Sequence, residues 1–202
     1  MTSTDKSPNK LYKELSSNSK SMNQVRLKEA YELASDGHDG QYRKSGEEYI
    51  THPLHVAIYL SEIGMDEETI IAALLHDVVE DTSIKLSTIK SRFGKDVALI
   101  VDGVTKLEKI NFSTNEEVKA ESIRKMVIAM SKDVRVLILK LADRLHNINT
   151  INSLPEWKQQ DIASETLYVY SPLAHRLGLQ NVKHQLEDIS FAILFPQQDK
   201  EI

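Results

Sequence analysis

Residues 71–82 read IAALLHDVVEDT, and this stretch carries two opposed signals. Its apolar residues follow a helical spacing, which predicts a helix with one buried face. A histidine and three acids stand among them, namely His76, Asp77, Glu80 and Asp81. On a helix these four side chains fall within an arc of about 140°, because each residue advances by about 100°. The stretch therefore predicts an α-helix with an acidic strip beside the core.

The acidic strip has two interpretations. The first is a solvated face, which is the usual fate of a charge run on an amphipathic helix. The second is a site for a divalent metal ion. Asp77 and Asp81 lie at i and i+4, a spacing at which like charges destabilise a helix by about 0.2–0.5 kcal/mol. The stretch contains no lysine or arginine to offset them. A cation would relieve the repulsion, so both interpretations stay open on these residues alone.

The rest of the chain is helical in pattern almost throughout. Residues 1–22 are rich in Ser, Lys and Asn and are interpreted as a flexible tail or a weak first helix. Two Val-Ile-Leu runs could be strands in isolation, but each sits within a longer helical pattern. Further helices are expected at about residues 25–37, 53–64, 66–82, 86–94, 95–104, 117–131, 133–150 and 181–195. Another helix is expected to begin at Pro155.

We predict one all-α domain at residues 23–196, a bundle of about eight to ten helices. A short C-terminal tail at 197–202 completes the chain.

Composition narrows the class of protein. The chain has 202 residues, a net charge of −5 and no cysteine. Disulfides, zinc–thiolate sites and cysteine nucleophiles are therefore excluded, and a metal ion would need His, Asp or Glu ligands. The negative charge argues against nucleic acid as a partner. No apolar run approaches the roughly 18 residues of a membrane span, and no apolar signal segment follows Met1. We expect a cytoplasmic enzyme or binding module without a membrane partner.

Two other places offer ligands of the same chemistry. His52 precedes a proline, so it should lie at the entrance of its helix. Asp143 lies within a very apolar helix, where a carboxylate is costly unless it is paired, hydrogen-bonded or bound to metal. The alternative for Asp143 is an ion pair with the nearby Lys140. One stripe of that helix, at i, i+4 and i+7, holds Asp143, Asn147 and Thr150.

These residues stand in recognisable motifs. The pattern of His52, His76–Asp77 and Asp143 is that of the HD-domain metal-dependent phosphohydrolases. The sequence motifs around these residues are more specific: GQYRKSGEEYITHP (40–53), ALLHDVVEDT (73–82), GVTKLEKI (103–110), KLADRLHN (140–147) and SPLAHRLG (171–178). Together these motifs resemble the hydrolase domain of the RelA/SpoT family, which breaks down the alarmone (p)ppGpp. The resemblance runs from about residue 24 to residue 196 and implies a helical HD-domain bundle.

The resemblance implies a metal site with four ligands. In the family the two histidines and two aspartates of the HD pattern hold one Mn²⁺, and here these are His52, His76, Asp77 and Asp143. Imidazole and carboxylate ligands suit Mn²⁺, although other divalent ions are possible. Two further histidines, His55 and His146, receive no ligand role and are interpreted as structural.

The resemblance also assigns residues to water activation and to substrate binding. Glu80 and Asp81 match a family pair that would orient or deprotonate the attacking water; which of the two takes the proton is left open. Arg43 would stack on the guanine base, while Lys44 and Ser45 would hold the base or the phosphates. Four residues of the helix that carries Asp143 complete the implied substrate site: Lys140, Arg144, Asn147 and Thr150. Of these, Lys140 and Arg144 are either phosphate ligands or members of structural ion pairs.

The implied reaction is hydrolysis of the 3′-pyrophosphate of ppGpp and pppGpp, which lowers alarmone levels in the stringent response. The products are GDP or GTP plus pyrophosphate. Two rival interpretations are an HD phosphohydrolase for another nucleotide such as NADPH, and a non-catalytic alarmone sensor. The synthetase and regulatory domains of long RelA/SpoT enzymes are absent from these 202 residues. We expect a stand-alone small alarmone hydrolase rather than an excised domain, with its oligomeric state, monomer or homo-oligomer, undecided.

Overall fold

The fold of the chain is all-α, as predicted. The computed structural model describes residues 7–108 and 133–197. The helix expected at about 117–131 and most of the expected C-terminal tail lie outside the described residues. Within the described ranges there is no β-strand, and one isolated bridge joins Tyr42 to Glu48. None of the described helices is long and apolar enough to span a membrane.

Most of the described residues lie in helices. Two short non-α turns, the 3₁₀ helix η1 (Ile151–Ser153) and the π-helix η2 (Thr166–Tyr170), flank α10. The α-helices are α1 (Pro8–Asn18), α2 (Gln24–Gly37), α3 (Thr51–Glu62), α4 (Glu67–Leu75), α5 (Val78–Asp81), α6 (Leu86–Phe93), α7 (Lys95–Glu108), α9 (Val134–Asn149), α10 (Glu156–Glu165), α11 (Ser171–Arg176) and α12 (Gln180–Leu194). Both Val-Ile-Leu runs are helical, within α7 and α9, as expected.

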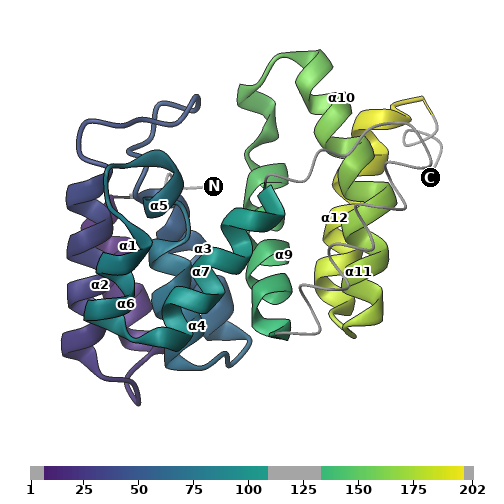
Figure 1. Cartoon of the computed structure of the whole chain (residues 1–202). Coiled ribbons are helices and arrows are strands. Elements are labelled where there is room, and N and C mark those ends of the chain that lie inside the picture. The colour runs from purple at the N-terminus through teal and green to yellow at the C-terminus, as the bar shows by residue number, and fades with distance from the viewer. Residues whose placement is uncertain (1–6, 109–132, 198–202) are drawn as a thin grey trace.

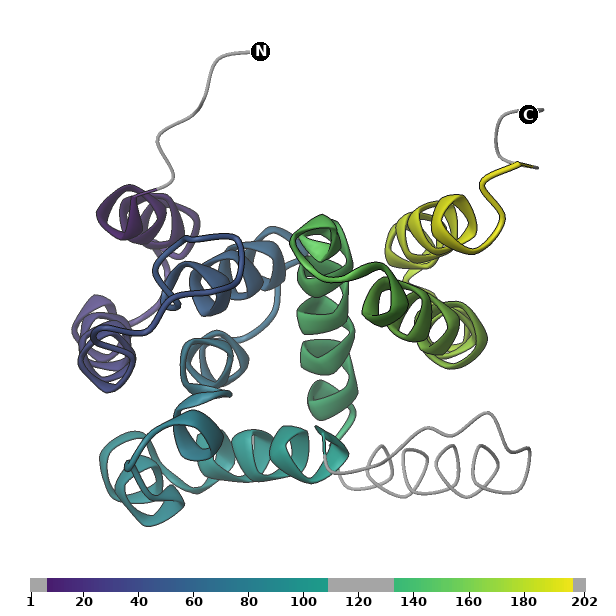
Figure 2. The same cartoon turned by 90° about the horizontal axis from the view of Figure 1, so that it is seen from above.

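Helix α9 stands between two groups of helices. Helices α1 to α7 lie on one side of it and α10 to α12 on the other (Figures 1 and 2). It contacts α3, α4 and α7 in the first group and α12 in the second. This position explains why the α9 sequence is apolar nearly all round, since a helix packed on both sides buries most of its circumference. Asp143 is therefore buried on a helix that both groups hold in place.

The contact between α7 and α9 depends on a small residue. A Cβ atom placed on Gly103 of α7 would lie 2.6 Å from Cγ2 of Val136 in α9. Such a distance is far below van der Waals contact, so a larger residue would push the two helices apart or displace Val136. Gly103 therefore sets how closely α9 approaches the first group.

The helix expected at 66–82 is interrupted, which corrects that prediction. Helix α4 ends at Leu75 and α5 begins at Val78, with His76 and Asp77 between them. The His76 ring takes part in ending α4, because its Nδ1 lies 2.8 Å from the backbone oxygen of Ala73. The last carbonyls of a helix lack intrahelical partners and accept such bonds readily. The break divides the acidic strip: His76 and Asp77 are buried, whereas Glu80 and Asp81 are exposed.

Residues 8–18 belong to the packed part of the chain, which corrects the interpretation of a flexible tail over that range. They form α1, with Pro8 as its first residue. Leu11 and Leu15 are buried in the core, and α1 packs against α3. The sequence left a weak first helix open here, and tertiary burial of two leucines is what stabilises it.

Candidate metal centre and adjoining cavity

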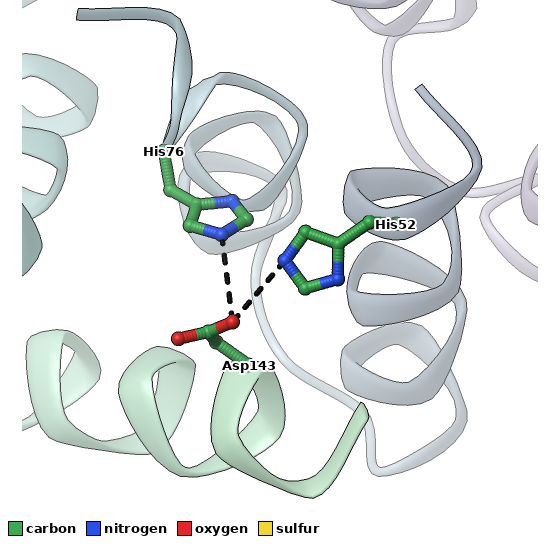
Figure 3. Close-up of side chains that lie close together, drawn as sticks. All are labelled: His52, His76 and Asp143. Carbon is green, nitrogen blue, oxygen red and sulfur yellow. Dashed lines mark ion pairs between the residues drawn. The ribbon is translucent and has the colours of Figure 1, made fainter. Parts of the chain in front are cut away.

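Three buried side chains from three elements converge beside α9. His52 comes from the first turn of α3, His76 follows α4, and Asp143 comes from the middle of α9 (Figure 3). Their ligand atoms all lie within 4.8 Å of one another. Oδ1 of Asp143 is 3.1 Å from Nε2 of His52 and 4.0 Å from Nε2 of His76. These separations suit three ligands arranged around one ion.

The proton positions on His76 favour a cation at this point. A backbone carbonyl only accepts hydrogen bonds, so the contact with Ala73 requires a proton on Nδ1 of His76. When the ring is neutral, its Nε2 presents a lone pair toward Asp143, and Asp77 Oδ1 lies 3.1 Å from the same nitrogen. Carboxylate oxygens and an imidazole lone pair facing one another repel unless a cation lies between them. The donor set contains nitrogen and oxygen only, which fits a divalent ion such as Mn²⁺, Fe²⁺ or Zn²⁺.

Burial favours the form of His52 that binds metal. The His52 side chain is buried, and this desolvation lowers its pKa below the usual value despite the nearby carboxylates. A neutral imidazole can offer a lone pair to an ion, whereas imidazolium cannot. The convergence of these buried ligands indicates a divalent metal site.

Asp143 is held by partners on its own helix. Lys140 donates to Oδ2 at 2.7 Å, and Nδ2 of Asn147 donates to Oδ1 at 2.6 Å. Burial acts to raise the pKa of Asp143, but the charge of Lys140 and the neighbouring groups outweigh it and hold that pKa well below its usual range. The carboxylate is therefore ionised and oriented. The ion pair with Lys140 and a ligand role for Asp143 are compatible, because the pair uses Oδ2 while Oδ1 faces the histidines.

A cavity of about 550 Å³ opens beside the cluster. It is bordered by the 42–44 loop, by the 77–81 region and by α9, η1 and α10. The residues predicted from the sequence that line it, besides the ligands His52, Asp77 and Asp143, are Arg43, Lys44, Glu80, Asp81, Lys140, Arg144, Asn147 and Thr150. His76 lies behind this lining, and Ser45 is exposed on the loop outside it.

The loop that carries Arg43 and Lys44 is a small hairpin. The amide of Arg43 donates to the oxygen of Glu47 at 2.9 Å, and the amide of Gly46 donates back to the oxygen of Arg43. Gly46 has φ +87°, a left-handed conformation that favours glycine. Arg43 reaches α9, where its guanidinium donates to Oδ1 of Asn147 at 2.8 Å. The residues predicted to bind the nucleoside thus lie within contact of one another.

Arg144 and Lys140 are both engaged with protein groups. Arg144 pairs with Glu165 of α10 at 2.8 Å, and its guanidinium lies 4.2 Å from the ring centroid of Tyr170. These contacts favour the structural alternative for Arg144, since they anchor α9 to the second group of helices. Lys140 is buried against Asp143.

Comparison with known proteins agrees with the helical fold and the histidine–aspartate cluster. Residues 30–180 match the family described as HD domain. The chain belongs to the HD-domain family. Within it, the predicted resemblance to RelA/SpoT proteins is confirmed by high sequence identity to several of them.

Two curated relatives of this HD domain are much longer than the chain itself. It is 51% identical over 177 residues to the bifunctional (p)ppGpp synthase/hydrolase SpoT of Escherichia coli, covering 88% of this chain and 25% of SpoT. It is 54% identical over 176 residues to a GTP pyrophosphokinase of Streptomyces coelicolor, covering 87% of this chain and 20% of the relative. The chain thus spans about a quarter or less of these curated relatives.

A solved structure matches over nearly its whole length. This structure, described as a metazoan ortholog of SpoT that hydrolyzes ppGpp, is 28% identical to the HD domain, with a TM-score of 0.59. The match covers 83% of this chain and 95% of the solved chain.

Two residues of the HD domain site were missed by sequence reasoning. The hydroxyl of Tyr49 lies 2.9 Å from Oδ2 of Asp77 and 2.8 Å from Oδ2 of Asp81, so it links the metal centre to Asp81 of α5. Tyr49 stands within the motif at 40–53, and the motif was the only signal for it. His146, interpreted as packed, lies with its Nδ1 2.8 Å from Nδ1 of His52. Nothing in a linear sequence indicates that contact across 94 positions.

Proposed function

We propose that this chain is a metal-dependent hydrolase that removes the 3′-pyrophosphate of ppGpp and pppGpp. The products would be GDP or GTP plus pyrophosphate. The single observation that carries the proposal is that the His52–His76–Asp143 cluster borders the cavity that Arg43, Lys44 and Asn147 also line. An anionic nucleotide in that cavity would have its base near the loop and a phosphate near the cluster.

The names of the relatives include both synthesis and hydrolysis, so the matched segment must be assigned to one of them. The SpoT and pyrophosphokinase chains extend far beyond the match. The metazoan structure is covered to 95%, and its description names ppGpp hydrolysis alone. The metal cluster and the acids of α5 suit attack by water, which supports hydrolysis for this segment.

The proposed division of labour follows from the positions of the side chains. A divalent ion, with Mn²⁺ our choice, would be held by His52, His76, Asp77 and Asp143, and would supply a more acidic water and charge neutralisation at the phosphate. Glu80 and Asp81 border the cavity beside Asp77 and would orient a water and accept its proton. Tyr49 donates its single hydroxyl proton to Asp77 or Asp81 and so fixes the spacing of the two carboxylates.

The bond changes in this reaction balance without a redox partner. The water oxygen bonds to the phosphorus attached to the ribose 3′ oxygen, and the bond between that phosphorus and the 3′ oxygen breaks. The ribose oxygen takes a proton, and pyrophosphate is released. Arg43 would hold the guanine by stacking of its planar guanidinium, with Asn147 and Thr150 contacting the nucleoside.

Incubation of the chain with ppGpp, with and without Mn²⁺, followed by anion-exchange separation of the products, tests the proposal. GDP and pyrophosphate that form only with the ion would support the reaction, the cleaved bond and the metal dependence. A parallel panel of pppGpp, NADPH and deoxynucleotides would identify a different substrate. Tight binding of ppGpp without turnover would contradict the proposal in favour of an alarmone sensor.

A further inference from the structure

The two histidines of the metal centre are oriented by different kinds of partner. Nδ1 of His76 lies against the backbone carbonyl of Ala73, which can act only as an acceptor. Nδ1 of His52 lies instead 2.8 Å from Nδ1 of His146, a side-chain atom that can be either a donor or an acceptor. The protonation pattern of His76 is therefore set by the backbone, whereas that of His52 depends on one side chain.

We propose that His146 is a positioning residue for the metal site: its Nδ1 accepts a hydrogen bond from Nδ1–H of His52 and so directs the lone pair of His52 Nε2 toward the metal. The inference rests on the proposed divalent-metal site but not on the identity of the substrate. It assigns a role to a histidine that the sequence marked as packed.

The geometry of the pair leaves two arrangements of the shared proton. At 2.8 Å one Nδ1 must carry a proton and the other must not, because two N–H groups or two lone pairs would repel at that distance. If His146 carried the proton, His52 would have its own proton on Nε2, which points toward Asp143 at 3.1 Å. That arrangement blocks the ligand position. Only the arrangement with His52 as donor leaves Nε2 of His52 able to bind an ion.

The surroundings of His146 hold its ring in the accepting position. His146 lies one turn after Asp143 on α9, so the residue that positions His52 and the ligand that faces His52 share one rigid helix. The ring of His55 stacks on His146 with centroids 5.0 Å apart and an interplanar angle of 21°. The two imidazoles of the pair are tilted by 48°. A metal-bound histidine typically donates its other ring N–H to a carboxylate, a backbone carbonyl or a water, which fixes its orientation; in this site Nδ1 of His146 would take that place.

A matched pair of substitutions separates the hydrogen bond from packing. His146→Asn and His146→Leu have side chains of similar size and shape, and both lose the stacking on His55. The amide oxygen of asparagine can stand near the position of the histidine Nδ1 and accept from His52, whereas leucine has no acceptor there. A difference between the two variants therefore reports the acceptor alone.

Two measurements on the 202-residue chain test the inference without using activity. The first is the Mn²⁺ affinity of the wild type and both variants. We expect the His146→Leu variant to bind Mn²⁺ about 10–100-fold more weakly, as losses of such partners do, while His146→Asn stays close to the wild type. The second is two-bond ¹H–¹⁵N correlation of the imidazoles at pH 8 in the protein loaded with Zn²⁺, a diamagnetic divalent ion, with His146 signals assigned through the His146→Asn variant. We expect a proton on Nε2 and none on Nδ1 for His146 in the wild type.

Two outcomes would overturn the inference. Equal Mn²⁺ affinity in the leucine and asparagine variants would reduce His146 to packing. A proton on Nδ1 of His146 in the Zn²⁺-loaded wild type would exclude that nitrogen as the acceptor, and this second readout holds even if the leucine variant does not fold. Failure of the wild type itself to take up a divalent ion is a different result: it would remove the metal site on which both proposals stand.

Discussion

The side chains of His52, His76 and Asp143 are 0–3% exposed, whereas Lys44 and Ser45 at the other end of the site stand on an exposed loop. The buried end is built from α3, α4 and α9, which pack directly against one another. The loop end is built from a hairpin held by a few backbone hydrogen bonds and by Arg43 reaching α9. The metal ligands are thus preorganised by the hydrophobic core, while the substrate-binding residues can adjust locally.

This difference separates the expected effects of substitution. Changes at the buried end should remove metal binding, turnover and part of the stability together, because one set of helices supports all three. Changes at the loop end should alter substrate binding and leave the fold intact. The acids of α5 lie between these extremes, since both are exposed but one of them, Asp81, is tied to Asp77 through Tyr49.

His76→Ala is expected to have the largest effect. It removes one of the buried ligands and also the bond to Ala73 that helps to end α4. We expect the Mn²⁺ affinity to fall by more than about 100-fold, and turnover to fall with it. This loss is larger than the usual loss when a residue that only hydrogen-bonds to a metal ligand is removed. The melting temperature of the wild type should rise with added Mn²⁺, because binding stabilises the folded state, and that of the variant should not.

The matched control is His184→Ala, which truncates an exposed histidine on α12. It should keep the wild-type response to Mn²⁺. Retention of that response in His76→Ala would show that the buried cluster is not the metal site.

The double variant Glu80→Gln, Asp81→Asn should come next in size. Loss of the proton acceptor should lower kcat by about 10²–10⁴-fold. Because both side chains are exposed, the fold, the Mn²⁺ affinity and the Kd for ppGpp should change little. Steady-state kinetics and nucleotide titration measure the two effects separately. A comparable loss of ppGpp binding would contradict a role in water activation, and Asp188→Asn on the exposed face of α12 serves as the acid control.

Arg43→Ala should act mainly on substrate binding. Loss of stacking and charge at a partly exposed site corresponds to about 0.5–2 kcal/mol, so we expect KM to rise by roughly 2–30-fold with kcat changed less. Arg43→Lys tests the geometry, because lysine keeps the charge but has no planar group to stack on a base. If the lysine variant kept the wild-type KM, the role of Arg43 would be charge attraction and not stacking.

The sequence and the structure differ in informative places. Apolar periodicity was enough for α7 and α9, because the pattern that predicts a helix is the one that packs it. It failed at His76, where a side-chain bond to Ala73 interrupts the helix without a Gly or Pro to signal it. The contact of His146 with His52 depends on how α9 packs against α3, which no local pattern encodes.

The smallest expected effect lies at the start of α9, outside the site. Arg135 donates to Asp133 at 2.7 Å and to Asp66, the N-cap of α4, at 2.8 Å. The hydrogen bond from Arg135 lowers the pKa of Asp133. Burial acts to raise the pKa of Asp66, but bonds from Thr69 and Arg135 outweigh it, so this pKa is lowered too. Arg135→Met should destabilise the fold at pH 7 by about 1 kcal/mol or less, since these groups are partly exposed and screened.

Acid pH should remove this difference between Arg135→Met and the wild type. A carboxyl group whose folded pKa is lowered contributes its full stabilisation above the unfolded value of about 3.9, and loses it as the pH falls through the folded pKa. Urea unfolding of both proteins at pH 7 and at decreasing pH below 4 should therefore show the gap closing. The Mn²⁺ affinity at pH 7 should be the same in both proteins. If Arg135→Met instead weakened Mn²⁺ binding as strongly as it affected stability, the metal centre would not be preorganised independently of the surface ion pairs that join α4 to α9.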